Sequence, residues 1–88
     1  MPEQEIGSVT HFFGGPGVAV VQIATGEVAL GDKLRFVGHT TDFTETVTSM
    51  EVDHKKVERA HTGDEVAVQV IGRVRRHDKV LKVEEATP

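Results

Sequence analysis

The 88-residue chain contains no cysteine, tryptophan, tyrosine or asparagine, and its aromatic residues are four phenylalanines. Without cysteine there are no disulfides, no thiol nucleophile and no cysteine-ligated zinc. With so few aromatic rings, the chain lacks the stacking platforms on which most single-strand nucleic-acid binders rely. These absences exclude thiol chemistry and disfavour sequence-specific recognition of single-stranded RNA.

A long hydrophobic run is also missing. No stretch approaches the roughly 20 apolar residues that a helix needs to cross a bilayer, and residues 1–5 lack the basic-then-apolar order of a signal peptide. Hydrophobic residues make up 38% of the chain and charged residues 27%, which is enough apolar material for a packed core. We therefore expect one soluble, cytoplasmic domain over residues 6–83, with flexible tails at residues 1–5 and 84–88 and no membrane contact.

Valine, isoleucine and threonine occur in short runs broken by glycine, which is typical of strands and turns. The run at residues 18–23 is apolar at almost every position, which predicts burial on both faces or a partly covered outer face. Neither face of residues 43–52 is wholly apolar, so a slipped phase or a bulge is expected there. Strands are predicted at residues 6–13, 18–23, 33–37, 43–52, 65–71 and 79–83.

Six strands separated by turn signals favour a small closed barrel, because closure removes the exposed edges of a short open sheet. Gly26, Gly31-Asp32 and Gly63-Asp64 mark structural turns between the strands. Residues 54–60 have mixed charge and few apolar anchors, so at most one short helical turn is expected there. The predicted fold is all-β, a six-stranded closed antiparallel barrel of the Greek-key type.

Several stretches that could carry chemistry fail on residue type or spacing. Residues 26–33 have the G-x4-G spacing of a phosphate-binding loop, but Asp32 stands where lysine must reach the phosphates, and its carboxylate would repel them. The five histidines form neither an H-x3-H nor an H-E-x-x-H pair. The two serines, Ser8 and Ser49, lie outside any nucleophile-elbow sequence. The sequence therefore predicts no enzyme, no catalytic residue, no bound nucleotide, no cofactor and no metal.

The net charge of −4 is unevenly distributed. Residues 1–53 hold two basic against eight acidic residues, a balance of −6, whereas residues 54–88 hold eight basic against six acidic residues, a balance of +2. If two basic clusters in the second part lie at one end of the barrel, they would form a patch for RNA phosphates or an acidic protein. The alternative is that they are ordinary solvated charges. The candidate contact residues are Lys55, Lys56, Arg59, Arg73, Arg75, Arg76 and Lys79.

Three motifs in register resemble a known family. Residues 21–38 are similar to the G-x-V/I-x-x-G-D/E-x-L/V core of domain 2 of translational GTPases such as elongation factor Tu. Residues 47–50 and 57–68 resemble its second signature, in which a V-x-S-[MI] strand leads to an A-x-x-G-D-x-V turn and strand. Residues 77–80 resemble its closing G-D-x-V, with His77 where glycine is usual.

The resemblance implies a six-stranded Greek-key barrel, and more narrowly a likeness to small stand-alone proteins described as translation elongation factor-like. Because the chain has no GTPase domain, switch-driven action on the ribosome is not implied. The interpretation that follows is a non-enzymatic module that binds RNA or a ribonucleoprotein surface in the neighbourhood of tRNA and rRNA.

Similar barrels also occur at the C-terminus of some collagenase-like peptidases that act with RNA modification. This likeness implies a second function, a protein-interaction adaptor that works in trans with a larger enzyme. An apolar patch on the outer face, including Phe12, Phe13 or Phe43, would favour this function over RNA binding.

Overall fold

The computed structural model describes residues 3–83. The flexible tails expected at residues 1–2 and 84–88 therefore lie outside the described residues, whereas residues 3–5 belong to the first strand. The described residues contain no helix, and therefore no helix among them is long and apolar enough to cross a membrane. Its strands are β1 (Glu3–Phe13), β2 (Val18–Ile23), β3 (Glu27–Ala29), β4 (Lys33–Val37), β5 (Asp42–Thr46), β6 (Met50–Val52), β7 (Lys55–Lys56), β8 (Arg59–His61), β9 (Glu65–Gln69) and β10 (Lys79–Val83).

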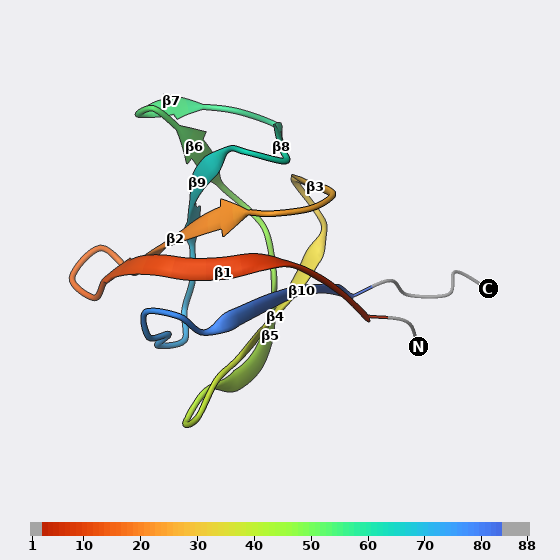
Figure 1. Cartoon of the computed structure of the whole chain (residues 1–88). Helices are drawn as coiled ribbons and strands as arrows, with labels where there is room; N and C mark the ends of the chain where they lie inside the picture. The colour runs from red at the N-terminus through yellow and green to blue at the C-terminus, as the bar shows by residue number, and fades with distance from the viewer. Residues whose placement is uncertain (1–2, 84–88) are drawn as a thin grey trace.

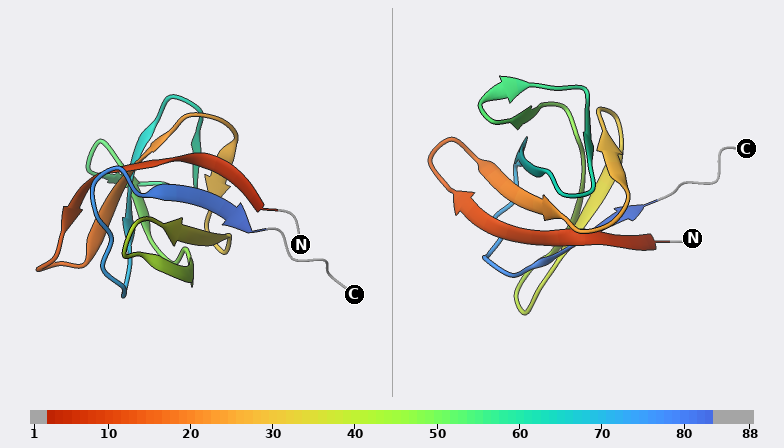
Figure 2. Two further views of the ribbon diagram at one scale, coloured as in Figure 1. Left: turned by 60° about the horizontal axis from the view of Figure 1, so that its bottom comes forward. Right: turned by 45° about the horizontal axis from the view of Figure 1, so that its top comes forward.

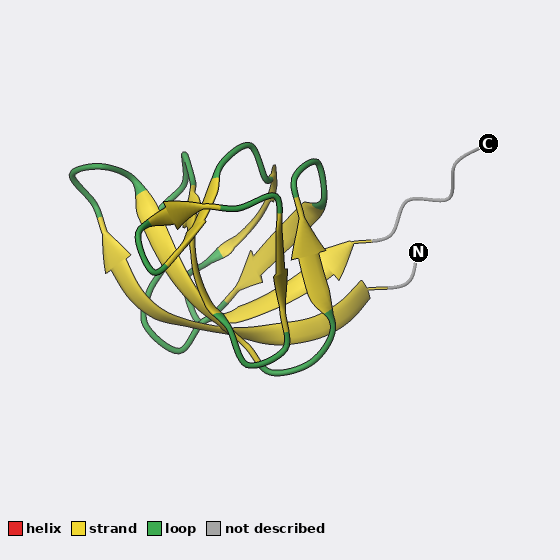
Figure 3. Ribbon diagram, turned by 90° about the horizontal axis from the view of Figure 1, so that it is seen from above, coloured by secondary structure: helices red, strands yellow, loops and turns green. Residues whose placement is uncertain are grey.

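Eight strands form one antiparallel sheet in the order β5-β4-β10-β1-β2-β9-β6-β7, and β3 pairs with β8 in a second, two-stranded sheet (Figure 1). The long β1 pairs with β10 through its first half and with β2 through its second half. Bulges between Glu5 and Gly7 and between Val9 and His11 bend this strand. The sheet consequently curls around a common interior, as Figures 2 and 3 show.

The expected closed six-stranded barrel is wrong, because within the described residues β5 and β7 are the unpaired edges of the large sheet. The cause lies in residues 43–52, which were expected to form one strand. Val47 continues the pairing just beyond β5, since its N–H donates to the Asp32 carbonyl and its carbonyl accepts from the Gly31 N–H, and β6 begins only at Met50. The segment therefore splits into β5 and β6, which lie near opposite ends of the sheet.

Residues 54–60, where at most one short helical turn was expected, contain no helical turn. Asp53 and His54 have φ angles of 52° and 64°, which suits the two-residue turn of a tight hairpin. They join β6 to β7, and the chain then continues into β8, which pairs with β3. Two short strands, β7 and β8, thus occupy most of this stretch.

The core lies inside the curled sheet and is rich in valine. Alternation along β2 turns Ala19, Val21 and Ile23 inward, and each of them is fully buried. Phe43 stacks on the buried Phe36 ring with centroids 5.2 Å apart. The buried hydrophobic residues are Ile6, Val9, Ala19, Val21, Ile23, Val28, Leu34, Phe36, Val47, Met50, Ala60, Val66, Val68, Val70, Val74 and Val80.

Three connections use the same turn, in which an aspartate carboxylate accepts a hydrogen bond from the backbone N–H three residues earlier. The residue before each aspartate has a positive φ: 92° at Gly31, 93° at Gly63 and 76° at His77. This backbone conformation favours glycine, so a histidine side chain is strained there. The donor and acceptor residues are Ala29 and Asp32 at 2.8 Å, His61 and Asp64 at 2.9 Å, and Arg75 and Asp78 at 2.8 Å.

Candidate functional site

The outer face of β2, β9 and β6 is hollowed into a groove that we call the outer groove. One half is a hollow of about 440 Å³ beside the β1–β2 hairpin, and the other is a hollow of about 430 Å³ beside the β8–β9 turn. The two halves share Val20, Glu51, His54 and Ala67, so they are continuous. The first half is also lined by Phe13, Pro16, Val18, Ser49 and Gln69, and the second by Val52, Asp53, Gly63, Asp64 and Glu65.

Strand register builds the floor of the outer groove. Because alternate residues of β2 fill the core, Val18 and Val20 point to the opposite face, where both remain partly exposed. Val20 lies opposite Ala67 of β9, and Ala67 lies opposite Glu51 of β6. Three strands that are distant in sequence therefore contribute one continuous row of outward side chains.

The half of the groove beside the β1–β2 hairpin is mainly apolar. Phe13 is 53% exposed there and stacks on the His11 ring, with centroids 6.2 Å apart. Of the phenylalanines considered for an outer patch, Phe12 and Phe43 instead pack against the core. Phe13 thus supplies an exposed aromatic ring at the apolar end of the groove.

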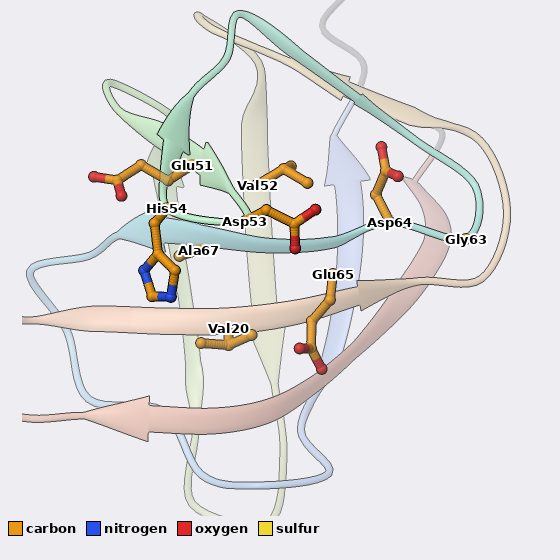
Figure 4. A pocket seen from close by; sticks show the side chains of 9 residues that line it. All are labelled: Val20, Glu51, Val52, Asp53, His54, Gly63, Asp64, Glu65 and Ala67. Carbon is orange, nitrogen blue, oxygen red and sulfur yellow. The ribbon is translucent and has the colours of Figure 1, made fainter.

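The other half of the groove is acidic, and Figure 4 shows its carboxylates around the hollow. Glu65 Oε2 accepts a hydrogen bond of 3.2 Å from the Thr10 hydroxyl, and Asp64 Oδ2 accepts from the His61 N–H. Among the residues that the structure describes, Glu51 and Asp53 have no hydrogen-bond or ion-pair partner for their carboxylates. This end therefore presents carboxylates that form no ion pair within the described chain, although Lys56 lies opposite Glu51 in the β6–β7 ladder.

Several other charged groups on the surface are paired, although Glu5 and Glu58, like Glu51 and Asp53, have no such partner among the described residues. Arg35 donates to both carboxylate oxygens of Asp42 at 2.9 Å and to Glu3 Oε1 at 2.9 Å. These hydrogen bonds lower the pKa of Asp42 and raise the pKa of Arg35. Lys82 Nζ lies 3.2 Å from Asp32 Oδ2. The carboxylates of Glu51 and Asp53 lack the partners that Asp42 and Asp32 have.

The basic residues expected to contact RNA or a partner do not form one patch. β7 and β8, which carry Lys55, Lys56 and Arg59, lie at the top of Figure 1, whereas the β9–β10 connection lies at the bottom left. The right view of Figure 2 also shows these segments apart. The structure thus divides the predicted residues between two ends of the molecule.

Each cluster has its own surroundings. Arg59 lies 3.6 Å from a carboxylate oxygen of Glu27. The second cluster has Arg73 in the β9–β10 connection, and Arg76 Nε donates to the Thr10 carbonyl at 3.0 Å. Arg75, Arg76 and Lys79 line a separate hollow of about 430 Å³ together with Val37, Gly38, His39, His77 and Asp78.

The remaining sequence candidates occupy turns or lack a ligand geometry. Gly26, in the turn between β2 and β3, has a φ of 84°. Across residues 3–83, no group of three or more histidine, aspartate or glutamate side chains is placed to hold a metal ion. The sequence did not predict the outer groove. The available signal was the apolar outer face of residues 18–23.

Comparison with known proteins points to peptidases. No protein-family profile matches the chain. The uncharacterized protease MJ0090 of Methanocaldococcus jannaschii is 35% identical over 82 residues, which cover 92% of this chain and 20% of that protein. The chain therefore spans about a fifth of the length of this curated relative.

Solved structures show the same fold. The C-terminal domain of a putative U32 peptidase from Geobacillus thermoleovorans superposes with a TM-score of 0.84 at 20% identity, over 92% of this chain and 93% of that one. The selenomethionine variant of that domain gives a TM-score of 0.79 at 20% identity, over 91% and 99%. Almost the whole described fold thus recurs as a domain of a protein named as a peptidase.

These findings overturn the expected kinship with translation factors, because the matching proteins are a protease and a peptidase domain. The motifs that carried the resemblance coincide with the aspartate turns, whose glycine and aspartate serve backbone geometry that unrelated β domains also need. Translation-factor function and RNA binding are left without support.

The expectation that the protein is not an enzyme is contradicted as well, since the curated relative is named as a protease. The match covers only 20% of that relative, so it identifies no catalytic residue in this chain and shows no activity for it.

Proposed function

We propose that this chain is a protein-interaction domain that works with a larger protein of the peptidase type and contacts its partner through the outer groove. The observation that carries the proposal is the asymmetry of coverage: 92% of this chain matches 20% of a protein named as a protease. In that relative, the matching segment is therefore one part of a much longer protein. The TM-score of 0.84 with the C-terminal domain of a putative U32 peptidase supports the same conclusion.

The outer groove has features of a protein-binding surface. Its two halves, at about 440 and 430 Å³, share lining residues and so form one surface long enough for a polypeptide segment. An apolar surface beside charged residues is typical of sites where proteins meet. Phe13 supplies an aromatic ring of the kind that often anchors such contacts.

The same surface disfavours RNA as its occupant. Glu51, Asp53, Asp64 and Glu65 would repel phosphates. The groove also offers a single exposed phenylalanine, whereas single strands are usually bound by several stacked aromatic rings. A polypeptide partner therefore fits the groove better than a nucleic acid.

The test is affinity capture of partners from the cells in which the chain occurs, followed by mass spectrometry. We expect the tagged chain to recover a larger protein of the U32 peptidase type and to bind it directly once both are purified. Val20→Lys, which places a charge on the groove floor, should reduce recovery and affinity at least tenfold.

Two further variants guard against a folding artefact. Phe13→Ser alters an exposed residue at the edge of the groove and should also weaken binding. Glu5→Lys introduces a similar charge on β1 outside the groove lining and should leave binding unchanged. Recovery of no peptidase-type protein, or equal binding by all the variants, would show that the proposal is wrong.

A further inference from the structure

We propose that the outer groove binds an extended peptide segment that carries apolar side chains at one end and lysine or arginine at the other. The inference rests on the proposed function and defines the chemistry of the segment that the partner presents. It follows from the shape of the groove, its apolar half and its unpaired carboxylates.

The shape of the groove suits an extended chain. Its lining reaches from Pro16 in the β1–β2 hairpin to Asp64 beside the start of β9. Along β2, the four-residue step from Val18 to Gln22 corresponds to about 13 Å. A segment of about four or five extended residues covers that length.

The apolar half of the groove determines which side chains one end of the bound peptide carries. Val18, Val20 and Ala67 are each partly exposed on the groove floor, and Phe13 flanks them. An aliphatic or aromatic side chain laid on this surface would remove apolar area from water on both partners. Alternate residues of an extended segment point to the same side, so two apolar residues spaced by one can contact this half together.

The acidic half of the groove determines which side chains the other end of the peptide carries. The carboxylates of Glu51 and Asp53 have no hydrogen-bond or ion-pair partner within the described chain, and the Glu65 carboxylate accepts a hydrogen bond from the Thr10 hydroxyl. On the adjacent β7, Lys56 lies directly opposite Glu51, but neither Lys55 nor Lys56 comes within ion-pair distance of these carboxylates. A guanidinium or ammonium group from the peptide would supply the missing positive charge.

The experiment uses fluorescein-labelled ten-residue peptides in a glycine-serine background. One peptide carries leucine at positions 3 and 5 and arginine at positions 7 and 9, and a second carries them in reverse order to test the opposite chain direction. Control peptides replace both arginines with glutamate or both leucines with serine. Binding to the full chain is measured by fluorescence anisotropy at low and high salt.

We expect one of the two orders to bind at least tenfold more tightly than both of its controls, and to weaken as salt rises. The double variant Glu51→Gln and Asp53→Asn removes charge with little change of shape, and asparagine tolerates the positive φ at position 53. It should weaken binding of the arginine peptide about tenfold or more. Glu5→Lys should have no comparable effect.

The inference is overturned if the glutamate peptide binds as tightly as the arginine peptide, if the double variant binds normally, or if neither order binds. Its failure is distinguishable from failure of the proposed function. If a peptidase-type partner is captured but the peptides bind without the expected preference, only this inference is wrong. If the peptides show the preference but no such partner is captured, only the proposed function is wrong.

Discussion

At the scale of single residues, position 77 carries backbone strain that the other two aspartate turns avoid. His77 has a φ of 76°, while Gly31 and Gly63 occupy the equivalent positions at 92° and 93°. A non-glycine residue in this region costs roughly 1–2 kcal/mol. The His77 N–H nevertheless donates to the Val9 carbonyl at 2.8 Å, so the backbone keeps this conformation.

We therefore predict that His77→Gly raises the free energy of unfolding by about 1 kcal/mol, because glycine relieves the strain and retains the backbone hydrogen bond. Urea denaturation followed by circular dichroism measures the change. Gly63→Ala is the matched opposite and should lower the free energy of unfolding by about 1 kcal/mol or more. A destabilised glycine variant at position 77 would contradict the interpretation.

At the scale of elements, one side chain ties the β9–β10 connection to the edge strand β5. Glu45 Oε1 accepts hydrogen bonds from the N–H groups of Ile71 at 2.6 Å and Gly72 at 2.8 Å. Gly72 also lies against the Phe43 ring. The connection is thereby held in place even though the Ile71 residue is 97% exposed.

Glu45→Ala should release this connection. Hydrogen bonds to a charged acceptor each contribute about 1.5–3 kcal/mol when well formed, and partial exposure lowers the value. We expect a loss of about 1–2 kcal/mol of unfolding free energy. Amide exchange at positions 71 and 72 should also accelerate.

Glu51→Ala is the matched control, since Glu51 lacks a described partner, and it should leave both measurements nearly unchanged. Equal exchange rates in the Glu45 variant and the parent chain would show that the connection is held by packing instead.

Elements were predictable from the sequence where local alternation decides them. Residues 18–23, 33–37 and 79–83 form the expected strands because their apolar residues alternate with a two-residue period or fill the strand. An irregularity within residues 43–52 was expected, but the division into two strands was not predictable, because it depends on β5 pairing with β4 and β6 pairing with β9. β7 has no apolar residue to reveal it.

The candidate site was harder to predict from the sequence than the strands were. The sequence named Phe13 as one of three aromatic residues for an outer patch, and the partial exposure of residues 18–23 was foreseen as one of two possibilities. Glu51, Asp53 and Glu65 reach the same surface only through the pairing of β9 with β6 and of β2 with β9. Such non-local register cannot be deduced from a single sequence.

At the scale of the whole molecule, β10 is the strand that joins two parts of the large sheet. It lies between β4 and β1, so the β4–β5 hairpin reaches the rest of the sheet through it. Val80, on β10, is completely buried. β10 is therefore central to the fold although it is the last of the described strands along the chain.

We predict that a chain ending at Asp78 fails to fold cooperatively, because it loses the ladder on both sides of β10 and exposes the core. Thermal unfolding and amide proton dispersion in NMR spectra would reveal this loss. Adding a synthetic peptide of residues 79–88 in excess should restore dispersion. A sharp unfolding transition in the truncated chain alone would contradict the assigned role of β10.

The pairing of β1 with β10 has a consequence for how the domain can be joined to other proteins. Glu3 lies opposite Val83, so the described chain enters and leaves the fold at neighbouring points, about 5 Å apart between Cα atoms. The far end of β1, at Phe13, lies at the outer groove. A host loop can therefore accept residues 3–83 as an insertion, because the points where the described chain enters and leaves the fold lie close together.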